Sequence, residues 1–334
     1  MRNLIVVLMG GISGEREISF LTGRACSQAL KKKNFKIKEL DAKGNFISIL
    51  KKLKPKLVFN ALHGKYGEDG FVQSILESLK IPYTHSGVIS SSLAMDKELS
   101  RYIFKKNKIK VPKCVLLKKK DNKIKINKKL KVKKINFPLV IKPTNEGSSL
   151  GVYICKNKKQ FNTHYNKLRN SYSRVLAEEY IPGKEIQVAV MGHKALGAIE
   201  LIPKREFYDY KAKYSSEANT KHIMPAKISK KKYQEVLSLA EKAHKVLNCK
   251  GITRSDFRFY KNQFYLLETN TQPGMTKLSL VPEIAKYCGI NFEDLVVWIA
   301  KNASNKYPPW IFPKMLLNKI IRRSRGNPGH IFPL

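Results

Sequence analysis

The stretch TRSDFRFYKNQFYLLETN, residues 253–270, places two acids at mirrored positions around a short turn. Aromatic and polar residues alternate in it with a period of two, which predicts a half-buried β-hairpin. A three-residue loop, Lys261–Gln263, gives the pairs Tyr260 with Phe264, Asp256 with Glu268, and Arg254 with Asn270. Two carboxylates then stand opposite each other, about 5 Å apart at Cβ, where they repel.

The other face of this hairpin is expected to enter a core through Phe257, Phe259, Tyr265 and Leu267. Opposed carboxylates beside the amide of Asn270 are hard oxygen ligands, which suit Mg²⁺ arriving with substrate phosphates. Arg254, on the same face, could stabilise a developing anion next to the metal. The alternative is a solvent-facing hairpin in another register, because an even loop length would separate the two acids.

The chain has 334 residues, 43% of them hydrophobic, and a formal charge of +40. The length predicts two or three domains with real cores, and the composition argues against global disorder. The charge would suit nucleic acid or an anionic membrane. Only 12 of the 65 basic residues are arginine, however, and no nucleic-acid-binding motif is visible. We therefore expect no dedicated nucleic-acid or membrane partner, and a polyanionic small substrate such as a nucleotide fits at least as well.

The five cysteines are widely spaced, without a C-x-x-C pair: Cys26, Cys114, Cys155, Cys249 and Cys288. This spacing argues for a reducing compartment and against a disulfide framework or a zinc site. The first residues run directly into a strand-like apolar segment without a cleavable small-residue site, and no apolar run reaches about 18 residues. We expect a cytoplasmic protein.

The opening segments NLIVVLMGG, FKIKELD and PKLVFNALHG alternate with helical patterns, which predicts a doubly wound parallel sheet. A helix near 95–106 then leads into a lysine-rich middle region, and strands with a helix near 229–247 follow from about residue 174. We place boundaries near residues 92, 180 and 302. The predicted parts are an N-terminal α/β domain 1–92, a central part 93–180, a C-terminal part 181–302 and a basic tail 303–334. The lysine-rich stretch 118–136 is most simply a solvated loop or edge.

A glycine- and serine-rich loop, residues 146–151, follows Lys142 at the end of an apolar strand. Small residues let backbone N–H groups turn onto phosphate oxygens, while the lysine supplies charge. The Gly-Lys-Ser/Thr order of a Walker loop is missing and a strand, not a helix, follows, so on its own this segment is better explained as a glycine-rich hairpin turn.

Three further segments carry chemistry-bearing residues. Glu15, in MGGISGEREIS, either stabilises a helix N-terminus or grips an ammonium group; Asp41 lies near where a ribose ligand would in a dinucleotide site. His63 directly follows a buried strand, which favours a site role over a structural one. The aromatic, charged segment FYDYKAKYSSE, residues 207–217, is typical of a closing lid or of an exposed loop.

In this order the segments resemble the D-alanine–D-alanine ligase family of the ATP-grasp superfamily. The resemblance rests on GGISGEREIS, ALHGKYGEDGFVQSILE, SGVISSSLAMDK, VIKPTNEGSSLGV, FYDYKAKY, GITRSDF and LLETNTQPGMTKLSLVP, which span about residues 3–300. The family joins two D-alanines in the cytoplasm through a D-alanyl phosphate, using ATP, for peptidoglycan precursors. The resemblance implies a mixed α/β and α+β chain, with an ATP-grasp fold preceded by a doubly wound parallel-sheet domain.

The resemblance also implies roles for single residues. Asp256, Glu268 and Asn270 match ligands of two Mg²⁺ (or Mn²⁺) ions. The ATP contacts correspond to Lys97, Lys142, Ser149, Glu178, Glu179, Tyr180, Ile181, Glu185 and Lys213. The catalytic group corresponds to Glu15, Ser148, Tyr214, Arg254 and Gly274. The D-alanine contacts correspond to Glu15 and His63 for the first molecule, and to Ser279 and Leu280 for the second.

A tyrosine at position 214, linked to Ser148 and Glu15, accompanies D-alanine as second substrate in the family, so the resemblance implies a dipeptide product. Formation of D-alanyl-D-lactate or D-alanyl-D-serine is the nearer alternative, and a basic nucleic-acid-associated protein that retains an ATP-grasp core is the remote one. Family members are commonly homodimers. The residues after about Ser304 extend beyond the family's usual end, either as a membrane-surface or partner-binding tail or as a loosely packed extension.

Overall fold

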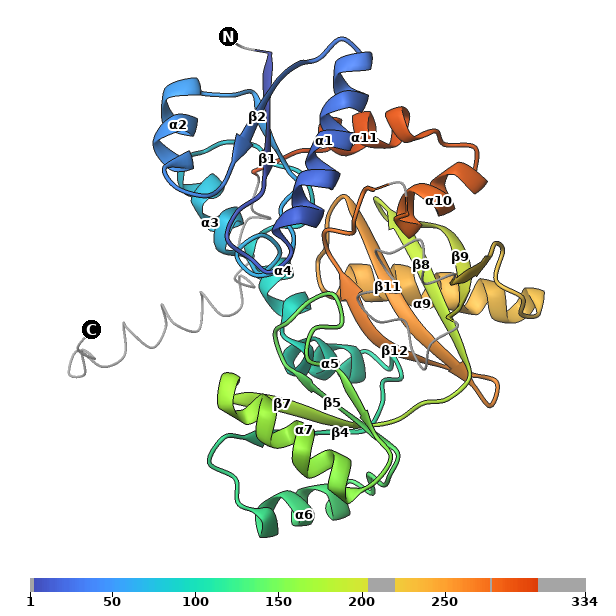
Figure 1. The fold of residues 1–334 in the computed structure, drawn as a ribbon. Helices are drawn as coiled ribbons and strands as arrows, with labels where there is room; N and C mark the ends of the chain where they lie inside the picture. Colours follow the sequence, from blue (N-terminus) through green and yellow to red (C-terminus); the bar gives the residue numbers. More distant parts are fainter. Residues whose placement is uncertain (1–2, 204–219, 277, 306–334) are drawn as a thin grey trace, which may run out of the picture.

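The computed structural model describes residues 3–203, 220–276 and 278–305, which form three sheets with helices around them (Figure 1). The first sheet is parallel, in the order β2-β1-β3, with β1 at Leu4–Met9, β2 at Lys36–Asp41 and β3 at Leu57–Asn60. Every residue of β1 and β3 is buried, as expected for strands covered on both faces. The helices of this part are α1 (Arg16–Lys32), α2 (Phe46–Leu53), α3 (Phe71–Ser78) and α4 (Val88–Met95).

Helix α5 (Lys97–Lys106) leads to the second sheet, which is antiparallel, in the order β4-β7-β5-β6. Its strands are β4 (Cys114–Lys118), β5 (Leu139–Pro143), β6 (Tyr153–Cys155) and β7 (Arg174–Glu179). Helices α6 (Lys123–Val132) and α7 (Lys158–Ser171) contribute Ile126, Phe161 and Leu168 to the core of this sheet. The second sheet thus has a core of its own.

The third sheet, also antiparallel, has the order β10-β9-β8-β11-β12. Its elements are β8 (Lys184–Met191), β9 (Lys194–Ile202), β10 (Lys221–Ile223), β11 (Ile252–Tyr260) and β12 (Gln263–Asn270), with α9 (Lys230–Val246), α10 (Leu280–Tyr287) and α11 (Phe292–Lys301). One core cluster joins Phe59 of the first sheet, Ile199 of the third and Val296 of α11. The chain therefore returns to the N-terminal sheet, where α11 lies beside α1 (Figure 1).

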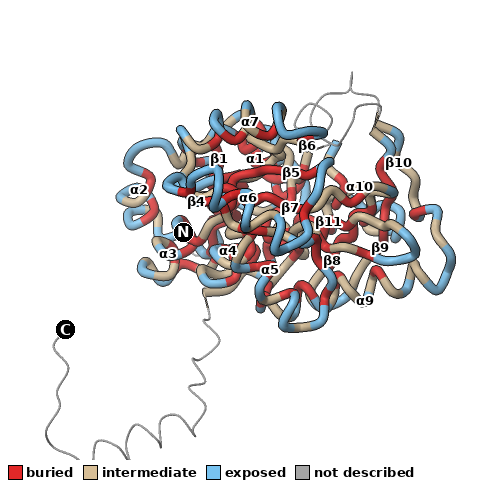
Figure 2. The backbone as a smooth tube through the Cα atoms, turned by 90° about the horizontal axis from the view of Figure 1, so that it is seen from below, coloured by how far each residue is buried: buried red, intermediate tan, exposed pale blue. Residues whose placement is uncertain are grey.

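Buried residues gather along the inner strands, whereas the edge strands β2 and β10 and many helix and loop residues at the periphery are more exposed (Figure 2). Within the described ranges, no helix is both long and apolar enough to cross a bilayer. The fold confirms the predicted class, a mixed α/β and α+β chain with a parallel N-terminal sheet.

In the β11–β12 hairpin, Asp256 and Glu268 pair as predicted, but the turn and the register differ from the prediction. Its loop has two residues, Lys261 and Asn262, both with positive φ (46° and 61°), so Tyr260 pairs with Gln263 and the predicted pair with Phe264 is wrong. An irregularity between Asp256 and Phe257 then shifts the register by one residue. Asp256 consequently faces Glu268, and Arg254 faces Asn270, as predicted.

The predicted core face of this hairpin is half wrong. Phe257 is fully buried and Phe259 packs against the core, but on β12 the core residues are Phe264 and Leu266. Tyr265 and Leu267 were expected there. The two-residue turn moves the β12 side chains by one position along the strand, which exchanges the two faces.

The lysine-rich stretch 118–136 is not a simple loop, because most of it forms α6. Asn122 caps the helix by accepting a hydrogen bond from the Lys125 N–H at 2.9 Å. The buried carboxylate of Asp121 contacts the ammonium groups of Lys125, at 3.2 Å, and Lys129. Helix capping and these two pairs explain why a basic segment is ordered.

Asp121→Asn is therefore expected to lower the thermal unfolding midpoint at neutral pH. Burial alone would raise the pKa of Asp121, but the Lys118 N–H and the Lys129 and Lys125 ammonium groups lower it to about 2. A lowered pKa stabilises the fold above the unfolded-state value near 4, and the contribution disappears as the pH falls towards 2. Because the partners are solvated, we expect on the order of 1 kcal/mol.

Thermal unfolding of both proteins at pH 7, 5 and 3.5 checks this. The difference in unfolding midpoint between the wild type and Asp121→Asn should be constant between pH 7 and 5 and smaller at pH 3.5. A difference that grows as the pH falls would contradict it.

Candidate active site

A first cavity lies between the second and third sheets. Its lining includes every described residue predicted to contact ATP: Lys97, Lys142, Ser149, Glu178, Glu179, Tyr180, Ile181 and Glu185. Asp256 and Glu268, on the hairpin, line the same cavity. Val140, Ile154 and Leu267 supply apolar walls. A flat, partly apolar group with an anionic tail would suit this lining.

A second cavity lies between the first sheet and the hairpin. It is lined by the predicted residues Glu15, His63, Ser148, Arg254, Asn270 and Gly274. Lys97, Glu146 and Glu268 line both cavities. The two cavities therefore meet at these three side chains, where groups bound in each could react.

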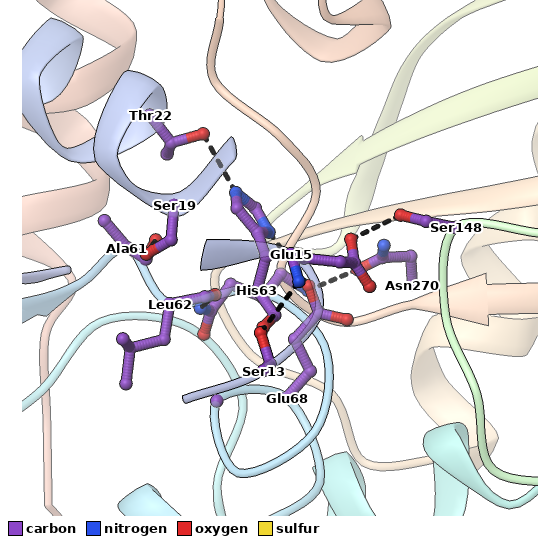
Figure 3. Close-up of polar contacts among 12 residues, drawn as sticks. Ser13, Glu15, Ser19, Thr22, Ala61, Leu62, His63, Glu68, Ser148 and Asn270 are labelled. Carbon is purple, nitrogen blue, oxygen red and sulfur yellow. Dashed lines mark hydrogen bonds and ion pairs between the residues drawn. The ribbon is translucent and has the colours of Figure 1, made fainter. Parts of the chain in front are cut away.

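Glu15 directly precedes α1 and is buried at the junction of two parts of the chain (Figure 3). The Ser148 hydroxyl, from the loop after β5, donates a hydrogen bond to its carboxylate. A Cβ on Gly64 or Gly147 would lie 2.8 or 2.7 Å from Oε1 of Glu15. Glycine at both positions thus makes room for this carboxylate.

His63 follows β3 and is buried with both ring nitrogens in contact with polar groups (Figure 3). Nε2 lies 2.9 Å from Oγ1 of Thr22, and Nδ1 lies 3.0 Å from Oε1 of Glu68. The imidazole orientation is therefore fixed from two sides. Asp41, considered above as a ribose ligand, is instead paired with Arg16 at 2.6 Å.

The two acids of the hairpin each contact a cation. Nε and Nη2 of Arg254 donate to the two carboxylate oxygens of Asp256 at 2.8 and 2.9 Å. Nζ of Lys97 lies 3.4 Å from Glu268. These pairs offset the repulsion between the opposed carboxylates in the protein alone.

The same hairpin offers a donor set that fits Mg²⁺. Asp256, Glu268 and Asn270 carry side-chain oxygens; Asp256 lines the first cavity, Asn270 the second, and Glu268 both. In the described part of the chain no group of three or more His, Cys, Asp or Glu side chains could hold a metal. Further ligands would have to come from bound phosphates and water, which is usual for Mg²⁺.

Lys142 and Glu178 form a buried pair in the wall of the first cavity, with Nζ 2.9 Å from Oε1. Burial lowers the pKa of Lys142, although Glu178 acts in the opposite direction. Burial would raise the pKa of Glu178, but Arg101 and Lys142 outweigh it and lower that pKa. Glu178 therefore stays ionised between two cations.

Ser279 and Leu280 line neither cavity. Ser279 precedes α10, its Oγ accepts from the Thr276 N–H at 2.9 Å, and a Cβ on Gly274 would lie 2.9 Å from it. The Leu280 side chain is buried in a core cluster, so any contact with a substrate would be through its backbone. Lys213 and Tyr214 lie outside the described residues.

Some residues around the cavities were not singled out from the sequence. Arg101 contacts Glu178, Arg258 contacts Glu185 at 3.1 Å, and Glu68 fixes His63. Arg101 is four residues after Lys97, which places both on one face of α5. That spacing was visible in the sequence, but it is common in a lysine-rich chain.

Two antiparallel sheets enclose one cavity and follow a parallel-sheet domain in the chain. This is the architecture of an ATP-grasp ligase, and it defines the class of this enzyme. The family models described as D-ala D-ala ligase N-terminus and D-ala D-ala ligase C-terminus match residues 39–86 and 103–301. The chain belongs to the D-alanine–D-alanine ligase family, and the resemblance found in the sequence is confirmed.

Relatives and solved structures agree with this assignment. The D-alanine–D-alanine ligase of Pelagibacter ubique is 53% identical over 91% of this chain and 99% of its own length. The D-alanine–D-alanine ligase of Wolbachia pipientis wMel is 45% identical over 90% of this chain and 94% of its own length.

Among solved structures, the Bacillus anthracis D-alanine–D-alanine ligase complexed with ATP has a TM-score of 0.77 at 29% identity, covering 97% of this chain and 99% of that one. The VanG D-Ala:D-Ser ligase of Enterococcus faecalis has a TM-score of 0.78 at 27% identity, covering 90% of this chain and 99% of that one.

Proposed function

We propose that this enzyme joins two D-alanines into D-alanyl-D-alanine, as a step in peptidoglycan precursor synthesis. ATP would bind in the first cavity and the first D-alanine in the second. The observation that carries this proposal is the meeting of the two cavities at Lys97, Glu146 and Glu268. A terminal phosphate and a substrate carboxylate would come together there.

The first step is transfer of the γ-phosphoryl group of ATP to the carboxylate of the first D-alanine. A carboxylate is a poor acylating agent, and phosphorylation converts it into a reactive acyl phosphate. Lys97 and Lys142 would neutralise charge on the transferring group. Mg²⁺, held by Asp256, Glu268 and Asn270, would supply further charge neutralisation and orientation when bound.

The second step is attack of the second D-alanine's amine on the acyl phosphate, which gives a tetrahedral oxyanion and then releases phosphate. Arg254 and the backbone N–H of Gly274 line the second cavity and would stabilise this oxyanion. Glu15, whose carboxylate is fixed by Ser148, would hold the ammonium of the first D-alanine beside His63. Ser279 and the first backbone N–H groups of α10 would hold the second carboxylate.

D-alanine as the acceptor is supported by the relatives, which are D-alanine–D-alanine ligases at 53% and 45% identity, whereas the D-Ala:D-Ser ligase that shares the fold is 27% identical. The family's specificity residue corresponds to Tyr214, which stays a prediction, as does the lid role of Lys213. We further propose a cytoplasmic homodimer whose parts are residues 1–92, 93–180 and 181–302. The tail 303–334 lies almost wholly outside the described residues.

D-alanine-dependent release of ADP tests this function. Purified protein with ATP, Mg²⁺ and D-alanine should release one ADP and one phosphate for each D-alanyl-D-alanine, and little ADP without D-alanine. Chromatography with D-lactate or D-serine added should still show mainly the D-alanyl dipeptide. Absence of D-alanine-dependent ADP release would refute the function, and a dominant mixed product would refute the acceptor.

A further inference from the structure

Arg101, on α5, is a charged side chain buried almost completely, with 1% of its surface exposed. It is the largest of the fully buried side chains in the described residues. Removing a guanidinium from water is costly unless it is paired. The partners that compensate its charge therefore indicate the role of this buried side chain.

Besides Cys114 on β4, Arg101 has two partners, and these belong to two different walls of the first cavity. Nη1 contacts Oε2 of Glu178 on β7, in the second sheet. Nη2 donates to the backbone oxygen of Leu267 on β12, in the third sheet, at 3.4 Å. Glu178 and Leu267 both line the cavity, whereas Arg101 itself does not. Arg101 can thus act on a bound molecule only through these neighbours.

Glu178 is shared between two cations. Its Oε2 faces Arg101, and its Oε1 lies 2.9 Å from Nζ of Lys142. The side chains of all three residues are at most 8% exposed. One carboxylate between two cations leaves a net positive charge on these three side chains. They are shielded from water, and electrostatic interactions are strong in such surroundings. Because Arg101 also pairs with Glu178, the charge of Lys142 is only partly compensated by this carboxylate.

We infer that Arg101 is a positioning residue for nucleotide binding: it holds Glu178 so that Lys142 keeps its ammonium group available to the phosphates of ATP. This inference rests on the proposed ATP site. Without the guanidinium, Glu178 and Lys142 form a neutral pair, and the attraction of Lys142 for a polyanion falls. The contact with Leu267 adds a second effect, because it fixes β12, which carries Glu268, against α5.

Arg101→Met should raise the KM for ATP, and its dissociation constant by titration calorimetry, about tenfold, as expected for a lost charged interaction. The KM for D-alanine should change much less than the KM for ATP, because Arg101 does not line the second cavity and reaches it only through β12, which carries Glu268. Arg101→Lys, which keeps the charge, should recover most of the ATP affinity. Should Arg101→Met fail to fold, Arg101→Gln removes the charge while keeping a hydrogen-bond donor.

Arg174→Met is the matched control. Arg174 also joins β7 to α5, through Asp96 at 2.8 Å and Glu98, but it lies outside both cavities and its side chain is 37% exposed. It should leave the affinity for ATP unchanged. A double variant, Arg101→Met with Glu178→Gln, adds a coupling test, and its effect on ATP affinity should be smaller than the product of the single effects.

Three results would overturn the inference. One is an unchanged affinity for ATP in Arg101→Met or Arg101→Gln. Another is an equal loss in Arg174→Met, which would reveal a general effect of joining α5 to β7. The third is independence of the two positions in the double variant. Calorimetry on the wild-type protein separates this test from that of the proposed function. If the wild type binds ATP but shows no D-alanine-dependent ADP release, only the proposed function is refuted. If it does not bind ATP, both the proposed function and the inference about Arg101 are refuted.

Discussion

Asp256→Asn should lower kcat by about a hundredfold or more, with an increased Mg²⁺ concentration for half-maximal rate. The change keeps the size of the side chain and removes the negative charge that faces Glu268 across the hairpin. If the two acids hold Mg²⁺ against the phosphates, the loss of one weakens both metal binding and neutralisation of the transferring phosphoryl group. Steady-state rates over a Mg²⁺ titration measure both effects.

Asp294→Asn is a suitable control for this prediction. Asp294 is an exposed acid on α11, paired with Lys33 at 2.7 Å, and it lines neither cavity. Its loss should leave kcat and the Mg²⁺ dependence unchanged. If Asp256→Asn behaved like this control, the hairpin would have no metal role.

The hairpin shows how far sequence reasoning reaches. Alternation of aromatic and polar residues predicted two strands and placed Asp256 opposite Glu268, which is correct. The predicted loop was one residue too long, and the register irregularity beside Asp256 compensated for that error. A bulge depends on contacts with neighbouring strands such as β8, so the local alternation carries little sign of it. The error in loop length put Tyr265 and Leu267 on the wrong face, because the residues between the turn and the bulge follow the register that the turn sets.

The position of residues around the cavities was predictable where they lie in loops after strands, as with His63 and Ser148, because such loops seldom serve packing. It was much less predictable where a helix carries the residue. Arg101 stands in a helix with three lysines, and nothing local shows that its side chain is buried. Leu280 illustrates the reverse, since its position matches the family's substrate contact while its side chain packs in the core.

Arg254→Met should lower kcat about a hundredfold to a thousandfold, the usual effect of removing one oxyanion donor. Arg254 and Gly274 line the second cavity next to the junction with the first, where the tetrahedral oxyanion would form. Two hydrogen bonds to Asp256 fix the plane of the guanidinium before substrate arrives. Such preorganisation makes the donor effective in the transition state and adds little to ground-state binding.

The pairing of Arg254 with Asp256 complicates both substitutions, because Asp256→Asn also loosens Arg254. The Mg²⁺ titration separates the two roles. Arg254→Met leaves both carboxylates in place, so its rate should fall with no increase in the Mg²⁺ requirement and with the KM for ATP nearly unchanged. Arg254→Lys keeps the charge but loses the two-pronged contact with Asp256, and should recover only part of the rate. If Arg254→Met needed more Mg²⁺ and Mg²⁺ then restored its full rate, Arg254 would serve to arrange the metal ligands, and the oxyanion would have to be stabilised by other groups.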